Sequence, residues 1–346
     1  MKIPQKTQAL RQVIKVLAYL LGLPPSEGKI QVNEDHDIEF TLLSFPGLTF
    51  QVFWKASGAA GPVSAALREA REKALTLAGP AIPLVSVPFM GPVGRKLCEE
   101  AGVGWLDLSG NARILAPGIR ILTDGRPNRF KRPGRPASVF APKSARIVRW
   151  LLMHPKRPVA QREIARATGM DEGFTSRIVA RLLKEGWVNR GADKKIRVPD
   201  PGLLLEAWKE AYDFGQHERI QGHVPSRTGS DLLRRAADVF KSRGVQYAAT
   251  GLGAAWLLVQ FGGFRTVTFF LEKHPDPILL EYINFREERR GANLWLVVPK
   301  DEGVFHGAAD REEIHCVHPV QAYIDLKAHP ERADEAAREI RRRILE

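Results

Sequence analysis

Five polar or basic side chains lie on one face of a helix predicted at residues 173–185, and three apolar side chains lie on the other. The polar set is Thr175, Ser176, Arg177, Arg181 and Lys184, and the apolar set is Ile178, Leu182 and Leu183. Small hydroxyl side chains near a helix N-terminus can approach base edges and phosphates, and arginine can pair with guanine through two hydrogen bonds. This spacing predicts a helix that inserts into the major groove of double-stranded DNA. The side chains expected to face the groove are Thr175, Ser176, Arg177 and Arg181.

The segments around this helix predict a winged helix-turn-helix. Helices are expected at 144–155 and 160–168, and the flexible backbone of Gly169 suits the sharp turn before the third helix. Residues 187–201 predict two strands around a basic tip, which would contact the DNA backbone or the minor groove. The basic residues of this tip are Arg190, Lys194 and Lys195. The alternative is a protein-docking module whose charged face is solvated.

Positive charge is concentrated in the middle of the 346-residue chain. Residues 125–199 hold 19 of the 52 Lys and Arg residues but only 5 of the 39 Asp and Glu residues. The remainder of the chain is nearly neutral, although the net charge of the whole is +13. One basic block between neutral flanks indicates a polyanionic partner such as nucleic acid.

A linker rich in Pro, Gly and Arg is predicted at 126–142, before the winged helix. Such a composition favours an extended, poorly packed chain. Its sequence KRPGRP, at 131–136, resembles the Gly-Arg-Pro core of an AT-hook, which lies in a narrow minor groove. The alternative is a basic tether that contacts phosphates only. The linker side chains expected to follow the DNA backbone or minor groove are Arg129, Lys131, Arg132 and Arg135.

The overall composition predicts a protein of the cytoplasm that needs no cofactor and no metal ion. Cys98 and Cys316 are too far apart for a metal-ligand motif or a disulfide framework, and we expect two buried thiols. No apolar run approaches the roughly 18 residues of a membrane span, so no membrane partner is expected. The amphipathic N-terminal segment lacks the uninterrupted apolar core of a signal peptide.

The N-terminal 125 residues predict an α/β domain whose order of strands and helices resembles the PD-(D/E)XK nuclease core. That chemistry needs two carboxylates for Mg²⁺ and a nearby lysine. Asp37 is the candidate for the first carboxylate and Lys55 for the lysine, but Phe53 occupies the position of the second carboxylate. An inactive nuclease-like domain is therefore expected, and an active Mg²⁺-dependent nuclease is the alternative.

The C-terminal part, 229–346, resembles a nucleotidyltransferase core. Residues 250–258 predict a Gly-rich turn that leads into a helix, where backbone N–H groups can meet phosphates. The family then needs paired aspartates on the next strand, and this strand instead reads Thr266, Val267 and Thr268. An inactive domain and a turn without a ligand are expected. The predicted class is thus α+β and multidomain, with boundaries at 1–125, 126–142, 143–212, 213–228 (a second linker) and 229–346.

Three further segments resemble AbiEi-like antitoxins of type IV toxin–antitoxin systems. They are 84–114, which contains the turn from Asp107 to Asn111, and the segments 247–258 and 317–343. The resemblance implies a DNA-binding repressor of its own operon, which in that family also encodes a nucleotidyltransferase-like toxin. The winged helix here is central, whereas the simplest members carry it at the N-terminus. From the residues alone, Asp107 and Asn111 are expected to close their turn through side-chain-to-backbone hydrogen bonds.

Together these patterns predict a transcriptional regulator without catalysis that binds double-stranded DNA, of the antitoxin autorepressor type. One alternative is a Mg²⁺-dependent nuclease that the winged helix targets to DNA. Another is a DNA-binding interaction subunit of a DNA-processing or defence complex. A cognate toxin or other protein, and a second copy of the chain, are further candidate partners.

Overall fold

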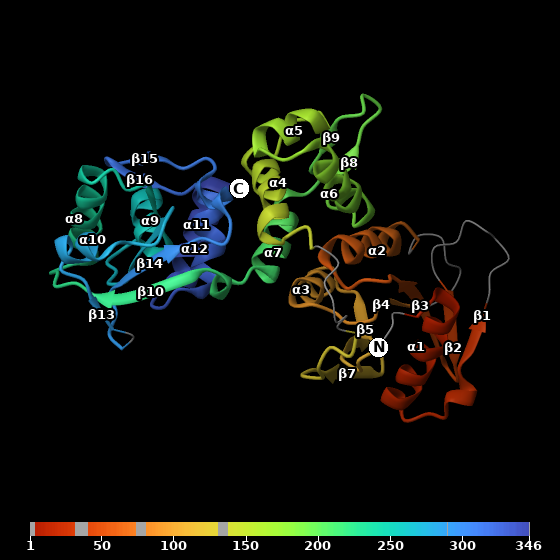
Figure 1. Ribbon diagram of the computed structural model, residues 1–346. Helices are drawn as coiled ribbons and strands as arrows, with labels where there is room; N and C mark the ends of the chain where they lie inside the picture. Colours follow the sequence, from red (N-terminus) through yellow and green to blue (C-terminus); the bar gives the residue numbers. More distant parts are fainter. Residues whose placement is uncertain (1–3, 32–40, 74–80, 131–137, 289, 346) are drawn as a thin grey trace. The chain divides into compact units, whose positions relative to one another are not determined.

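The computed structural model describes residues 4–31, 41–73, 81–130, 138–288 and 290–345. The chain divides into two compact units (Figure 1). The first unit is Met1–Pro136 with Lys184–Trp187, and the second is Ala137–Leu183 with Val188–Glu346.

The first unit is built on a seven-stranded sheet whose strands follow one another in sequence order, β1 to β7. The strands are β1 (Lys29–Gln31), β2 (Thr41–Phe45), β3 (Leu48–Trp54), β4 (Ile82–Val87), β5 (Gly104–Asp107), β6 (Ala112–Ala116) and β7 (Ile119–Thr123). β3, β4 and β5 are parallel, whereas the remaining pairs are antiparallel. β2 and β3 form a hairpin around Pro46 and Gly47, and Gly47 has the positive φ that its turn requires.

Helices cover both faces of this sheet because its central strands are apolar on both sides. On β3, Phe50 and Val52 pack with α1 (Lys6–Leu21) in one core, whereas Phe53 packs with α2 (Ala60–Lys73) in the other. α3 (Pro92–Glu100) contributes Cys98 to this second core. The alternation of side chains along β3 thus separates the two cores.

The second unit begins with the predicted three helices and wing. They are α4 (Pro142–Met153), α5 (Gln161–Thr168), α6 (Glu172–Lys184), β8 (Asn189–Arg190) and β9 (Ile196–Arg197). α7 (Pro201–Ala211) follows, and the Asp200 carboxylate caps it by accepting a hydrogen bond from the Leu203 N–H at 2.8 Å.

A second seven-stranded sheet forms the C-terminal part of this unit, in the order β13-β10-β14-β12-β11-β16-β15. Its strands are β10 (Glu218–His223), β11 (Tyr247–Thr250), β12 (Val267–Leu271), β13 (Arg286–Glu287), β14 (Leu294–Val298), β15 (Ala309–Arg311) and β16 (Ile314–Cys316). Its helices are α8 (Gly229–Ser242), α9 (Gly251–Val259), α10 (Pro277–Tyr282), α11 (Pro319–Asp325) and α12 (Ala333–Ile340).

Residues 213–228, predicted to be a linker, contain β10, which pairs with both β13 and β14 inside the second sheet. The prediction failed because the strand reads Glu-Arg-Ile-Gln-Gly-His, with little of the apolar alternation that marks a half-buried strand. The expectation of two buried thiols is confirmed: Cys98 and Cys316 are buried and unpaired, and burial raises the pKa of each to about 12.

Thr228 is the N-cap of α8. Its backbone is extended, and its hydroxyl oxygen accepts a hydrogen bond from the Asp231 N–H at 3.1 Å. Gly244 has a left-handed conformation just beyond the C-terminal end of the helix.

We expect Thr228→Ala to lower the free energy of unfolding by about 1 kcal/mol, because it removes the acceptor for an N–H that has no partner within the helix. Ser230→Ala is the matched control: it removes a hydroxyl that lies 3.0 Å from the Thr228 hydroxyl but leaves the acceptor of the cap in place. Chemical denaturation of the two variants measures the difference, and a loss in Ser230→Ala equal to that in Thr228→Ala would contradict the assignment.

Candidate nucleic-acid interface

The inner side of the winged helix is a small apolar core that fixes the direction of α6. Ile147 from α4, Ile164 from α5, and Ile178, Val179 and Leu182 from α6 are all buried. Because these α6 positions recur at helical spacing, one face of the helix is committed to the core and the opposite face is left to solvent.

The turn between α5 and α6 is held from both ends. Gly169 has φ 65° and ends α5, and the Met170 N–H donates to the Ala165 carbonyl at 3.0 Å. On the other side, the Asp171 carboxylate accepts a hydrogen bond from the Phe174 N–H at 2.7 Å. The role of Gly169 was predicted from the sequence, whereas that of Asp171, a residue type favoured at helix N-termini, was not.

The outer face of α6 carries most of the predicted contact residues. Ser176, Arg177 and Lys184 are exposed, and Arg181 is partly exposed. Thr175 is a correction, because its side chain is 0% exposed and cannot face a groove. It lies three, four and seven positions before the buried Ile178, Val179 and Leu182, so it belongs to the inner face of the helix.

An aromatic ring that the sequence analysis did not select supports the cationic face of α6. The Arg177 guanidinium lies over the Phe174 ring, 6.0 Å from its centroid, and the Lys143 amino group of α4 lies 5.6 Å from the same centroid. Cation–π contacts of this kind restrict a long side chain and keep its charge near the surface. Phe174 therefore brings two cations from different helices together at the N-terminal end of α6.

The wing presents its three predicted basic residues at an ordered tip. Arg190, Lys194 and Lys195 are exposed, and Lys194 adopts a left-handed φ of 60°. The Asp193 carboxylate accepts hydrogen bonds from the Arg197 guanidinium at 2.7 and 2.8 Å and from the Lys195 N–H at 3.1 Å.

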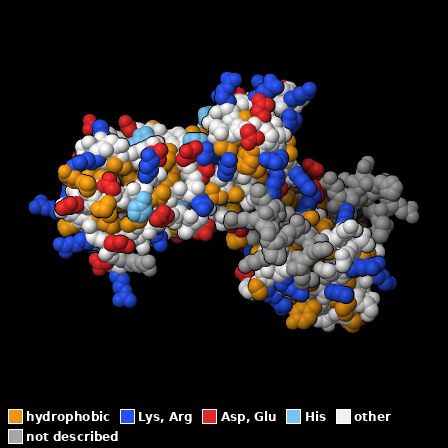
Figure 2. Space-filling view, viewed as in Figure 1, with side chains coloured by type: hydrophobic (Ala, Val, Ile, Leu, Met, Phe, Trp, Pro, Cys, Tyr) orange, Lys and Arg blue, Asp and Glu red, His pale blue; other side chains and the backbone are white. Residues whose placement is uncertain are grey.

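These bonds have two consequences for the charge of the wing. The side-chain hydrogen bonds from Arg197 hold the pKa of Asp193 well below its usual range, so Asp193 is an anion at neutral pH. The pair neutralises Arg197, and Arg190, Lys194 and Lys195 remain as the cations of the wing. In the space-filling view, Lys and Arg side chains gather around α5 and the wing (Figure 2).

Of the linker residues predicted to contact DNA, only Arg129 lies within the described part of the chain, where it is exposed. Lys131, Arg132 and Arg135 lie outside the described residues. The Arg129 N–H donates to the Ser109 hydroxyl at 3.2 Å, and Phe130 is buried in the first core. The beginning of the predicted linker is therefore part of the first unit and is packed against it.

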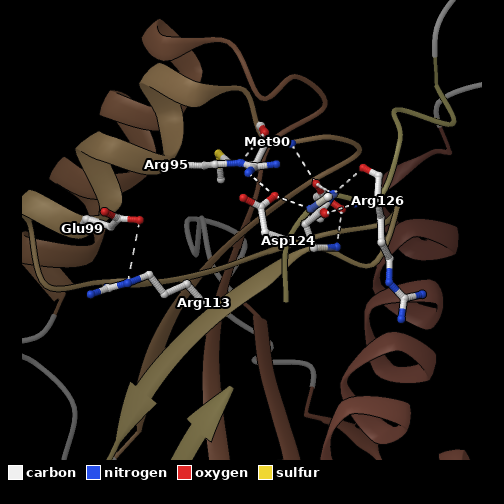
Figure 3. A network of polar contacts seen from close by, with 9 residues as sticks. Met90, Arg95, Glu99, Arg113, Asp124 and Arg126 are labelled. Atoms are coloured by element: carbon white, nitrogen blue, oxygen red, sulfur yellow. Dashed lines mark hydrogen bonds and ion pairs between the residues drawn. The ribbon is translucent and has the colours of Figure 1, made fainter. Parts of the chain in front are cut away.

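The turn from Asp107 to Asn111 holds this segment in place, in the network of polar contacts of Figure 3. The Asp107 carboxylate accepts hydrogen bonds from the Asn111 N–H at 3.0 Å, the Asn111 side-chain amide at 2.9 Å and the Met90 N–H at 3.2 Å. The Asn111 side chain then accepts from the Arg126 N–H at 2.8 Å and donates to the Arg126 carbonyl at 3.0 Å. The expected closure of the turn is confirmed, and Asn111 also fixes the backbone of Arg126.

The arrangement around Lys55 bears on the nuclease-like candidates. The Lys55 amino group forms an ion pair with Glu69 of α2, while Phe53 is fully buried. Asp37 lies outside the described residues. Among the residues that the structure describes, no group of three or more His, Cys, Asp and Glu side chains could hold a metal ion.

The Gly-rich turn before α9 is filled by a side chain of the protein itself. A Cβ atom at Gly251 would lie 2.3 Å from His329 Nε2, so the ring occupies the space above the turn. His329 Nε2 is 2.9 Å from the Thr268 hydroxyl, and His329 Nδ1 is 2.8 Å from the Asp325 carbonyl. Burial lowers the pKa of His329 to about 4, so the ring is neutral at physiological pH. Thr268 occupies the strand position where the nucleotidyltransferase pattern needs a carboxylate, and its hydroxyl there contacts the His329 ring.

Comparison with known proteins gives one match. Residues 141–195 match the sequence model of the MarR family, and this range contains α4, α5, α6, the first strand of the wing and its tip. No curated protein and no solved structure matches the chain. None of the helices in the described residues is long and apolar enough to cross a membrane. The match supports a DNA-binding transcriptional regulator, and residues 141–195 are similar to the winged-helix domain of the MarR family.

Proposed function

We propose that this protein binds double-stranded DNA through the outer face of α6 and the wing, and that it regulates transcription. The observation that carries the proposal is the grouping of exposed cations on two neighbouring elements of a MarR-like winged helix. Arg177 lies on α6, and Lys194 and Lys195 lie at the tip of the wing. A helix and a wing arranged in this way can contact the major groove and the flanking phosphates together.

Within this proposal, the residues of α6 have different roles. Arg177, which Phe174 supports, reads a base edge, and Ser176 lies beside it on the exposed face. Arg181 and Lys184 lie further along the helix and contact the phosphate backbone. Thr175 contributes by packing beneath this face, because it is buried.

The finer proposal is an autorepressor of the antitoxin type, without catalysis. It rests on the resemblance of the segments 84–114, 247–258 and 317–343 to AbiEi-like antitoxins. A cognate toxin and a second copy of this chain are the protein partners of this proposal. Arg129 adds a contact with the DNA backbone or minor groove, as do Lys131, Arg132 and Arg135, which lie outside the described residues.

The experiment is fluorescence anisotropy with the duplex upstream of the protein's own gene and with a scrambled duplex, over a series of salt concentrations. The DNA is afterwards run on a denaturing gel, with and without Mg²⁺. Tighter binding to the upstream duplex, with intact strands, supports the autorepressor. Equal binding with a steep salt dependence rejects autoregulation in favour of general DNA binding. Strand cleavage that needs Mg²⁺ rejects a protein without catalysis.

We expect Arg177→Ala to weaken binding to the specific duplex by about 1–3 kcal/mol and to relax the preference at one base pair, because a bidentate contact with guanine is lost. Arg338→Ala, which removes an equal charge from the exposed side of α12, is the control and should bind like the unmodified protein. Equal weakening of specific and random DNA by Arg177→Ala would refute the assignment of Arg177 to base reading.

We expect Lys194→Ala to lower affinity for all duplexes alike and to reduce the slope of log K against log salt by about 1, because one phosphate contact is lost. Alanine keeps the Cβ atom, so the left-handed backbone at this position is equally strained in both proteins. Lys241→Ala on α8 removes an exposed lysine outside the winged helix and serves as the control. A change in sequence preference without a change in slope would contradict the phosphate contact.

A further inference from the structure

A buried guanidinium joins α4 of the winged helix to the C-terminal part of the second unit. Arg149 is 3% exposed, and its Nε and Nη2 atoms donate to the side-chain oxygen of Gln321 on α11, at 3.0 and 2.5 Å. Burial lowers the pKa of Arg149 to about 10, so the group is still protonated at neutral pH. The acceptor of both hydrogen bonds is a neutral amide oxygen and not a carboxylate.

The nearby carboxylates are occupied by other groups. Asp325 accepts hydrogen bonds from Tyr212, Thr250 and Gln321, at 2.6 to 2.7 Å. Asp301 accepts two hydrogen bonds from Arg146, at 2.7 and 2.8 Å. Burial raises the pKa of Asp325 to about 7, although the hydrogen bonds from Thr250, Tyr212 and Gln321 favour its charged form. The hydrogen bonds found for Arg149 in the described part of the chain thus do not reach either carboxylate.

Two buried N–H donors close to this charge have no hydrogen-bond partner among the described residues. They are Nη1 of Arg149 and the indole Nε1 of Trp208, a side chain that is 0% exposed. The guanidinium lies 5.1 Å from the centroid of the Trp208 ring. A buried donor without an acceptor typically costs about 1–3 kcal/mol, so two such donors in one place indicate a missing acceptor.

Both side chains line the same small cavity. The space open to the centre of a water-sized particle is about 10 Å³, so the cavity holds one small particle. Its walls include the apolar side chains of Phe140, Pro142 and Val304. A Cβ atom at Gly303 would lie 2.8 Å from Arg149 Nη1, so glycine is needed for the close approach of the backbone on this side.

Tyr212, His217 and Asp301, which also line this cavity, are engaged with other groups. The Tyr212 hydroxyl donates to Asp325 and is 2.8 Å from His217 Nε2, and His217 Nδ1 accepts from the Lys300 N–H at 2.9 Å. The oxygens of Asp301 accept from Arg146 and from the Gly303 N–H. The further polar side chain of the lining, Gln216, is a neutral amide. The cavity thus offers two unpaired donors and a positive charge, and its one carboxylate is paired with Arg146.

We propose that this cavity is a binding site for a small monovalent anion of halide size, held by Nη1 of Arg149 and Nε1 of Trp208. An anion is a pure acceptor, so it satisfies both donors and offsets the buried charge, whereas a water molecule would leave the charge uncompensated. The small space favours a monatomic anion over sulfate and larger organic anions. The bound anion links α4 of the winged helix to α7, and so stabilises the second unit independently of DNA binding.

The first test is thermal unfolding of the full chain in sodium gluconate, with chloride or bromide replacing gluconate at constant ionic strength. We expect a saturable rise in Tm of about 2–4 °C with either halide, because a ligand that binds only the folded state stabilises it. Replacement by sulfate should give no saturable rise. A Tm that does not depend on the halide overturns the proposal.

Trp208→Phe is the decisive variant, because it retains an aromatic ring but removes the N–H donor. It should shift the midpoint of the halide titration at least about tenfold, as expected for a lost hydrogen bond to a charged group. Trp256→Phe, on α9 and outside the lining of the cavity, should titrate like the unmodified protein. A Trp208→Phe variant that folds and responds to halide with an unchanged midpoint would rule out this site.

A crystal grown with bromide locates the anion directly. The expected result is an anomalous peak within hydrogen-bonding distance of both nitrogen atoms. Density at this position without anomalous signal would identify a water molecule and reject the anion. DNA binding is measured separately, so failure of this site leaves the proposed function untouched, and failure of DNA binding leaves this site untouched.

Discussion

The burial of Arg149 is the constraint on which the second unit depends. A guanidinium inside a protein is tolerated only when its donors find acceptors, and here Gln321 supplies the oxygen for two of them. Gln321 in turn donates to Asp325, and Asp325 accepts from Thr250 at the end of β11. A single chain of hydrogen bonds therefore connects a helix of the winged helix to the central region of the C-terminal sheet. Its members depend on one another, because removal of one leaves buried polar atoms without partners.

An ion pair lies one turn earlier on α4 and adds a second contact between this helix and the C-terminal part. Arg146 pairs with Asp301 through two hydrogen bonds and also contacts Glu302. Arg146 and Arg149 are three residues apart, so they project from the same side of the helix. This side of α4 contacts the C-terminal part, while α4 also packs against α5 within the winged helix. α4 therefore packs against both the winged helix and the C-terminal part, and the two form one compact unit.

Periodicity in the sequence predicted much of the winged helix but could not assign each polar residue to its face. Ile178 and Leu182 are buried as expected, whereas Thr175 was placed outside because hydroxyl side chains are common at DNA contacts. The spacing of Thr175 from Ile178 and Leu182 indicated the inner face of the helix, but the prediction followed the residue type instead. β10 was missed for a related reason, since its sequence is polar and its pairing with β13 and β14 is non-local. Local patterns carry little information on such long-range pairing.

The charge count is the clearest case in which residue type and residue role differ. The basic block at 125–199 includes Arg146, Arg149 and Arg197, whose charges are directed into the protein or paired with acidic side chains. The burial of Arg149 cannot be predicted from its neighbours in sequence. Its hydrogen-bond partner Gln321 lies 172 residues further along the chain, and Trp208 lies on α7, the helix after the wing. The cations predicted on α6 and the wing stay at the surface, and several of them are positioned by neighbouring groups. Phe174 supports Arg177, and Asp193 fixes the backbone that carries Lys194 and Lys195. Affinity for DNA should therefore depend on these few positioned cations more than on the net charge of the segment.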